Sequence, residues 1–221
     1  MNMADQASPR THAERFIALW LRCAPHASAA QARAIHGRLC AAYGEAGRYY
    51  HALPHIEHCL CEFDGARAAI AAADDVELAL WYHDAVYQPG DSDNEGRSAA
   101  LLAEHSAGQL ADAQVARIGA LILATTHANA PQDAQAAWVV DIDLSSFGLP
   151  WPAFLHDSRA VRAEMKGLAD DDYQRSHGSF LRGLVARPRI YTSEHFHGRC
   201  EQRARDNITR LLHAYATGIT L

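Results

Sequence analysis

The segment that decides the fold is VELALWYHDAVY, residues 76–87. Apolar side chains lie on nearly every face of the helix that it would form, which is typical of a helix at the centre of a bundle. Its only strongly polar groups are Glu77, His83 and Asp84. Because a carboxylate buried without a partner is costly, we expect these groups to pair with other residues or to bind a cation.

Three further segments place ionisable groups among apolar residues: RIGALILATTHA (117–128), AAWVVDIDLSSF (136–147) and YYHALPHI (49–56). Their ionisable groups of interest are His127, Asp141, Asp143, His51 and His55. Pro54 favours a helix start, so His55 would lie in a first turn that faces the same core. A divalent metal would satisfy these groups together.

The wider pattern predicts an all-α fold, because alanine and leucine recur at helical spacing and alternating β-branched runs are missing. We expect one domain over residues 1–221, a bundle of about 8–10 helices, with 1–10 as a flexible N-terminus. The predicted helices are 11–23, 27–43, 54–72, 75–87, 94–108, 112–128, 134–146, 151–167, 171–186 and 194–216. Ser92 and Glu95 have the spacing of a capping box.

Composition excludes several classes of protein. The net charge of −6 argues against a nucleic-acid footprint or an anionic-membrane surface. No apolar run approaches the ~18–20 residues that a membrane span requires. The five cysteines are odd in number and form no C-x-x-C pair, which favours reduced thiols in the cytoplasm.

Chance alone explains part of the His-Asp pattern. With 14 histidines in 221 residues, and 16 aspartates, about one His-Asp dipeptide is expected at random, and the sequence has two. His156-Asp157 lies on an ordinary amphipathic segment, and we take it as the random pair. His83-Asp84 lies in an apolar segment, where a metal site competes with a buried ion pair or an interfacial polar patch.

Other interpretations compete with a single metal site. A structural zinc site could use a cluster of His51, His55, His58, Cys59 and Cys61, but this cluster lacks the usual paired ligand spacing. Glu95 is a capping residue that becomes a candidate catalytic residue if its loop folds over the site. His127 is balanced between a core histidine and a site residue.

The order His, His-Asp, Asp on successive helices resembles the HD superfamily of metal-dependent phosphohydrolases. The segments that carry the resemblance are YYHALPHIEH, LALWYHDAVYQPGDSDNEGRSA, LILATTHA, DIDLSSFG and RPRIYTSEHFHGRCEQRARDN, which together extend over nearly the whole chain. They are similar to a bacterial branch of predicted HD phosphohydrolases.

The resemblance implies His55, His83, Asp84 and Asp143 as metal ligands, with Asp141 as a rival to Asp143. It implies that His51 is the acid that protonates the leaving group, although Ala52 stands where an asparagine is common. It also implies that His127 lies near the substrate. The expected activity is hydrolysis of a small phosphorylated metabolite or nucleotide.

Two imidazoles and two carboxylates suit one divalent ion, with Mn²⁺, Fe²⁺, Co²⁺, Ni²⁺ or Mg²⁺ a better fit than tetrahedral zinc. Two other functions stay open. A di-iron oxygenase of the HD type would need two further histidines, for which His105 and His127 are available, although His105 lies in a helix end that we expect to be exposed. A nucleotide-binding module without turnover is the third.

Overall fold

The computed structural model describes residues 11–131 and 133–218, so the expectation for residues 1–10 lies outside the described part. Within these ranges the chain forms ten α-helices and two short 3-10 helices, and no strand. The prediction of an all-α fold is confirmed. None of the helices in the described ranges is both long enough and apolar enough to span a bilayer.

The helices follow one another with short connections. They are α1 (His12–Cys23), α2 (Ala29–Tyr43), α3 (Leu53–Ala66), η1 (Arg67–Ala69), α4 (Ala73–Tyr82), α5 (Asn94–Ser106), α6 (Asp112–Ala124), α7 (Ala134–Asp143), η2 (Leu144–Gly148), α8 (Trp151–Glu164), α9 (Asp170–Ala186) and α10 (Glu194–Thr217).

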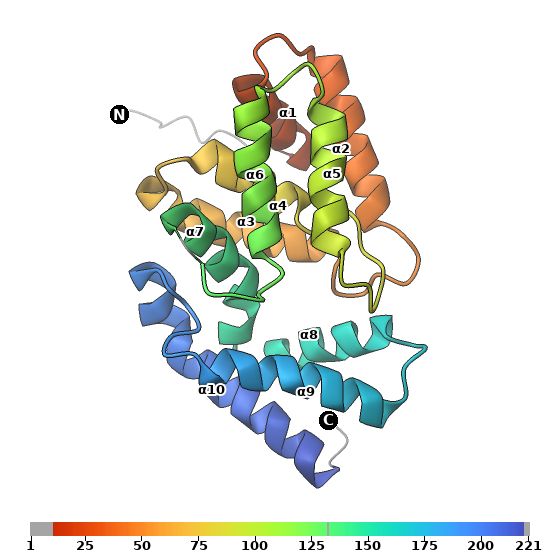
Figure 1. Cartoon of the computed structure of the whole chain (residues 1–221), viewed down its shortest axis with the longest axis vertical. Helices are drawn as coiled ribbons and strands as arrows, with labels where there is room; N and C mark the ends of the chain where they lie inside the picture. The colour runs from red at the N-terminus through yellow and green to blue at the C-terminus, as the bar shows by residue number, and fades with distance from the viewer. Residues whose placement is uncertain (1–10, 132, 219–221) are drawn as a thin grey trace, which may run out of the picture.

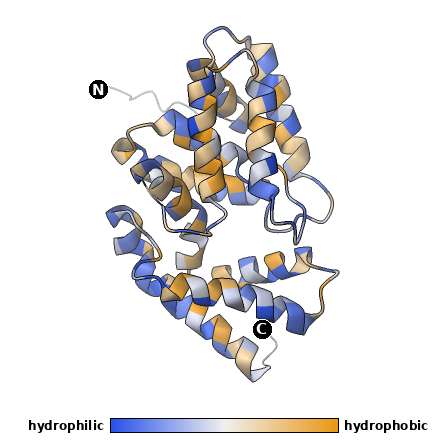
Figure 2. Cartoon of the chain, in the orientation of Figure 1, coloured by the Kyte–Doolittle hydropathy of each residue, from blue (hydrophilic) through white to orange (hydrophobic). Residues whose placement is uncertain are grey.

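The helices form an upper and a lower group (Figure 1). Helices α1, α2, α5 and α6 make the upper group, α8, α9 and α10 make the lower one, and α3, α4 and α7 lie between them. Figure 2 shows hydrophobic residues along much of α6 and hydrophilic ones over much of α10. Of the three middle helices, α4 is the most completely buried.

Helix α4 occupies the centre, as its sequence predicts. All eight residues from Asp75 to Tyr82 are buried. The Glu77 carboxylate accepts hydrogen bonds from Arg15 Nε (2.7 Å) and Arg67 Nη1 (2.9 Å). The buried acid at this end of α4 is thus satisfied by arginines, which leaves the other end of the helix for the histidines.

Helix α4 ends at Tyr82, five residues before the predicted limit of the segment 75–87. The carbonyl groups at its end are satisfied from outside the helix. The Tyr43 hydroxyl donates to the Trp81 carbonyl (2.9 Å), and Arg48 donates to the carbonyls of Asp84 (2.6 Å) and Ala85 (3.0 Å). His83 and Asp84 therefore lie on a turn at the helix end, not within the helix.

The predicted capping box at Ser92–Glu95 is wrong. Asp93 precedes α5, and its side chain makes no capping hydrogen bond. The side chain of Asn94 stabilises the loop instead. Its Oδ1 accepts from Gln88 N (2.8 Å), and its Nδ2 donates to Gln88 O (3.1 Å). Glu95 is consequently free of the capping role.

A connection over residues 187–193 joins α9 to α10 and is fixed by buried charges. Glu201 accepts hydrogen bonds from the amides of Ile190 (3.0 Å) and Tyr191 (3.0 Å) and from Arg205 Nε (2.7 Å). Burial opposes the ionisation of Glu201, but these donors outweigh it and hold its pKa below the ordinary value.

Helix α10 also holds η2, the turn that follows α7. Asn207 Nδ2 donates to the carbonyls of Phe147 (2.8 Å) and Leu149 (2.9 Å), and the Tyr191 hydroxyl donates to Leu144 O (2.7 Å). A Cβ atom on Gly148 would lie 2.6 Å from Cys200 Cβ, so only glycine permits this approach. The end of α7 is therefore fixed from the C-terminal helix.

Candidate metal centre

Three helix ends meet in the middle of the molecule and bring together the four predicted ligands. His55 lies in the first turn of α3, His83 and Asp84 follow α4, and Asp143 is the last residue of α7. The two imidazoles are buried, and each carboxylate side chain is 13% exposed. The site is thus nearly enclosed, with its remaining opening on the carboxylate side.

The ligand atoms converge on one point. His55 Nε2 lies 3.1 Å from His83 Nε2 and 3.2 Å from Asp143 Oδ1. Asp84 Oδ2 lies 3.1 Å from His83 Nε2 and 3.5 Å from His55 Nε2. Two ligands that each lie about 2.1 Å from an ion are separated by roughly 3.0–3.4 Å. These separations match those of donors around a single cation.

The tautomer of His83 supports the same conclusion. Its Nδ1 donates to the carbonyl of Leu80 (2.9 Å), which leaves the Nε2 lone pair directed at the two carboxylates and at His55. Facing lone pairs repel unless a proton or a cation lies between them. Burial opposes the charged form of His83, but Asp84 and Asp143 outweigh it and raise the pKa of the imidazole well above its ordinary value. A cation would satisfy all four groups.

A thiol lies beside these donors. Cys59 is fully buried, and its Sγ is 3.7 Å from His55 Nε2. Donor atoms of His55, Cys59, His83 and Asp143 all lie within 4.8 Å of one another and could hold a metal ion. This group and the four predicted ligands share His55, His83 and Asp143, and they differ in having Cys59 or Asp84 as the fourth residue. Burial, with the charges of Asp143 and Asp84, raises the pKa of Cys59 well above its ordinary value.

His51 stands next to the centre and is oriented by a residue that the sequence argument did not single out. Glu164, the last residue of α8, accepts from His51 Nδ1 (2.6 Å) and from the amides of Tyr49 (2.7 Å) and Tyr50 (2.7 Å). The Tyr87 ring stacks on the His51 ring, with centroids 4.0 Å apart. The imidazole is therefore fixed on one nitrogen and on one face.

His127 is held in an unusual backbone conformation. It is the only non-glycine residue of the described chain with a positive φ, which is 55°. Its Nε2 lies 2.9 Å from Asp143 Oδ2, and its carbonyl accepts a hydrogen bond from Arg187. Its Nδ1 is buried without a partner among the described residues. Such local strain is common at functional sites, where the rest of the structure stabilises it.

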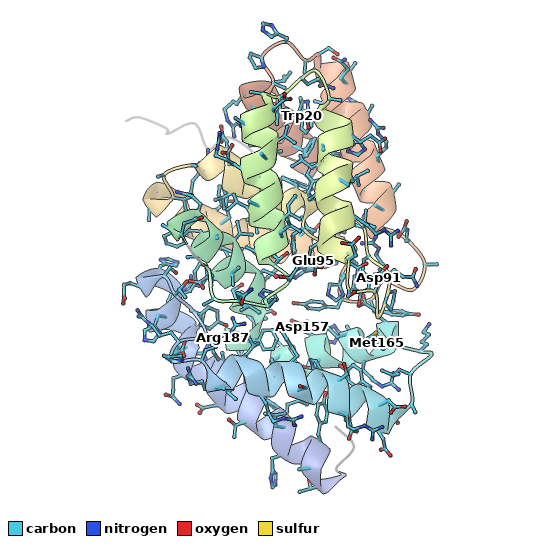
Figure 3. The ribbon with its side chains drawn as sticks, in the orientation of Figure 1. Trp20, Asp91, Glu95, Asp157, Met165 and Arg187 are labelled. Carbon is cyan, nitrogen blue, oxygen red and sulfur yellow. The ribbon has the colours of Figure 1, made fainter. Side chains whose placement is uncertain are left out.

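Two half-buried carboxylates lie on opposite sides of the space between α5 and α8 (Figure 3). Glu95 belongs to α5, and burial, with the nearby charge of Asp84, raises its pKa. Asp157 belongs to α8, and burial raises its pKa while His156 and then His55 oppose the shift. His156 is exposed, as its amphipathic segment predicts, but Asp157 is half-buried and close enough to His55 for the two charges to interact. No pattern in the sequence predicts that Asp157 lies near the site.

Asp141 lies apart from the centre. Its carboxylate accepts hydrogen bonds from the amides of Thr192 (3.0 Å) and Ser193 (2.7 Å) and so holds the start of α10. The structure brings Asp143, and not Asp141, to the two imidazoles.

His105 is also separate from the centre, but for a reason that the sequence argument did not give. We expected an exposed side chain, whereas His105 is 5% exposed and its Nδ1 pairs with the Tyr82 hydroxyl (2.9 Å). The expected exposure is therefore wrong, although the residue stays outside the donor group.

The five residues considered for structural zinc do not gather around one point. His58 Nε2 pairs with Ser145 Oγ (2.8 Å), and Cys61 is exposed. Of that cluster, only His55 and Cys59 belong to the donor group found among the described residues.

Comparison of the chain with protein-family models, with curated proteins and with solved structures finds no match. The chemistry and geometry of this site are therefore the basis for assigning a function.

Proposed function

We propose that the protein is a metal-dependent phosphohydrolase that acts on a small phosphorylated substrate. The observation that carries the proposal is the convergence of His55, His83, Asp84 and Asp143, whose donor atoms lie 3.1–3.5 Å apart in the five pairs measured among them. When bound there, a divalent ion would polarise a phosphoryl oxygen and activate water for attack.

The proton for the leaving oxygen comes from His51. Its Nδ1 is engaged by Glu164, so Nε2 is the atom that can transfer a proton. Burial opposes the charged form of His51, but Asp84 and Glu164 outweigh it and raise its pKa, which favours the protonated ring that an acid needs. Glu164 acts through His51 as a positioning residue.

His127 and Glu95 flank the reaction space. His127 holds Asp143 through Nε2, so it orients a ligand carboxylate, while its Nδ1 is buried without a partner among the described residues. Glu95 is half-buried beside Asp84 and can accept a proton from water. The di-iron alternative needs His105 as a ligand, and that imidazole is bonded to Tyr82 instead.

The test uses chain stripped with a chelator and reloaded separately with Mn²⁺, Fe²⁺, Co²⁺, Ni²⁺ or Mg²⁺. Phosphomonoesters, nucleotides and cyclic nucleotides are offered as substrates, and released phosphate or nucleoside monophosphate is measured. We expect hydrolysis that requires the ion and disappears in Asp143→Ala. Tight nucleotide binding without product under any ion would instead make the protein a binding module.

A further inference from the structure

We propose that Cys59 is a donor of the metal centre and sets its metal preference, so that the centre selects a borderline-soft ion such as Fe²⁺, Co²⁺ or Zn²⁺ over Mg²⁺. The inference rests on the metal centre of the proposed function but not on the reaction. It adds Cys59 to the four donors described above and does not replace Asp84.

The position of the sulfur supports this assignment. Cys59 follows His55 by one turn of α3, so both side chains lie on the same face of the helix. Its Sγ is 3.7 Å from His55 Nε2, the atom that faces His83 and Asp143. A thiolate about 2.3 Å and an imidazole nitrogen about 2.05 Å from the same ion lie about 3.1–3.6 Å apart, depending on the angle between them, so the 3.7 Å separation is close to that of two donors of one centre.

The surroundings of the thiol point to the same role. Cys59 is 0% exposed and unpaired in any disulfide, and its polar contacts in the described chain are the two ring nitrogens of His55. A buried cysteine that only fills space packs against apolar groups. This one lies within 4.8 Å of the donor atoms of two imidazoles and a carboxylate.

The donor chemistry then decides the ion. Mg²⁺ binds oxygen ligands in near-octahedral geometry and keeps several waters, whereas thiolate and imidazole favour zinc, iron and cobalt. Sulfur is a donor that Mg²⁺ does not favour, so a thiolate added to the two imidazoles and two carboxylates moves the preference of the centre away from Mg²⁺. Zinc, which the count of imidazoles and carboxylates alone disfavours, becomes a candidate once sulfur is included.

The chain contains a matched control for this geometry. His36 and Cys40 on α2 have the same spacing of four residues, and Cys40 Sγ lies 3.5 Å from His36 Nε2. That pair belongs to no donor group of three or more among the described residues. It therefore reproduces the cysteine–histidine contact without a metal centre.

The experiment loads the full chain with Co²⁺ and records its absorption, because a thiolate bound to Co²⁺ gives a charge-transfer band in the near ultraviolet that oxygen and nitrogen ligands do not give. We expect the band in the wild type and in Cys40→Ser, with one Co²⁺ per chain. The band should be lost in Cys59→Ser and in Cys59→Ala, with Co²⁺ affinity lower by at least about tenfold and Mg²⁺ affinity little changed.

Circular dichroism shows whether Cys59→Ser and Cys59→Ala fold. If only one of them folds, the Co²⁺ spectrum of that variant decides the test. A wild type that binds Co²⁺ without the band, binds no Co²⁺, or retains the band in Cys59→Ser would overturn the assignment. The band together with no hydrolysis of any phosphoester would keep this inference and refute only the proposed reaction.

Discussion

At the scale of single residues, two aspartates of α7 that stand two positions apart have different roles. Asp143 faces the imidazoles, and Asp141 accepts the amides of Thr192 and Ser193. We expect Asp143→Ala to lose bound metal. Asp141→Ala should keep its metal and lose about 1–3 kcal/mol of unfolding free energy, because two partly buried amides lose their acceptor. Elemental analysis and urea unfolding of both variants measure this, and metal loss in Asp141→Ala alone would reverse the assignment.

Glu164 gives a second prediction at this scale. In Glu164→Gln the His51 ring loses its charged partner but the donor group is untouched. We expect kcat to fall by about 10–100-fold, since general acid catalysis contributes about 10²–10⁴-fold and is here only weakened. Metal content and KM should stay near wild type. Equal loss of metal and activity would show that Glu164 only supports the fold.

His105 gives a third. Its imidazole is buried against Tyr82, so His105→Ala should cost about 1–3 kcal/mol of stability and leave the metal content at one ion per chain. The exposed His156 is the control, and His156→Ala should change neither quantity. Two irons in the wild type, with one lost in His105→Ala, would favour the oxygenase.

At the scale of the elements, the connection over residues 187–193 depends on one carboxylate, Glu201, which faces Arg205 and His197. Its pKa is lower in the folded chain than in the unfolded one, so its contribution is present above the ordinary glutamate value near ~4.3 and is lost as the pH falls through the folded value. Glu201→Gln should therefore destabilise the protein by about 1–3 kcal/mol at pH 7 and much less at pH 3. Urea unfolding at the two pH values tests the sign.

The helices show how much of the fold the sequence predicts. Apolar periodicity locates all ten described α-helices, because the spacing of apolar residues along a helix is a local property of the chain. It misses the C-terminal ends of α3, α4 and α6, where the predicted helices run to 72, 87 and 128 but the structure ends them at Ala66, Tyr82 and Ala124. For α4, the end depends on Tyr43 and Arg48, which are distant in sequence.

The sequence likewise predicts only part of the candidate site. The polar residues inside apolar segments predict His55, His83 and Asp84, because a buried charge needs a partner wherever it lies. They leave Asp141 and Asp143 as alternatives, and the packing of α7 brings Asp143 to the imidazoles. This pattern does not reveal Glu164 and Asp157, because both lie on α8, an ordinary amphipathic helix. The orientation of α8 is set by tertiary packing.

At the scale of the whole molecule, the candidate metal centre takes its donors from α3, from the end of α4 and from α7. A ligand that binds only the folded chain stabilises it by about 2.7 kcal/mol at 100 times its Kd. We therefore expect the melting temperature to rise with metal in the wild type and to fall on addition of a chelator. Asp143→Ala should melt at the same temperature with and without the ion, and a metal-dependent shift in that variant would place the binding site elsewhere.

The hold of α10 on η2 has a consequence for biosynthesis. The turn after Asp143 is fixed by Tyr191 and Asn207, and Gly148 lies against Cys200. A growing polypeptide exposes His55, His83 and Asp84 long before these late residues leave the ribosome. Its metal pocket is then missing the support of its last carboxylate, so metal loading should follow the completion of translation. We therefore expect the ion of the proposed metal centre to bind the finished polypeptide rather than the nascent one.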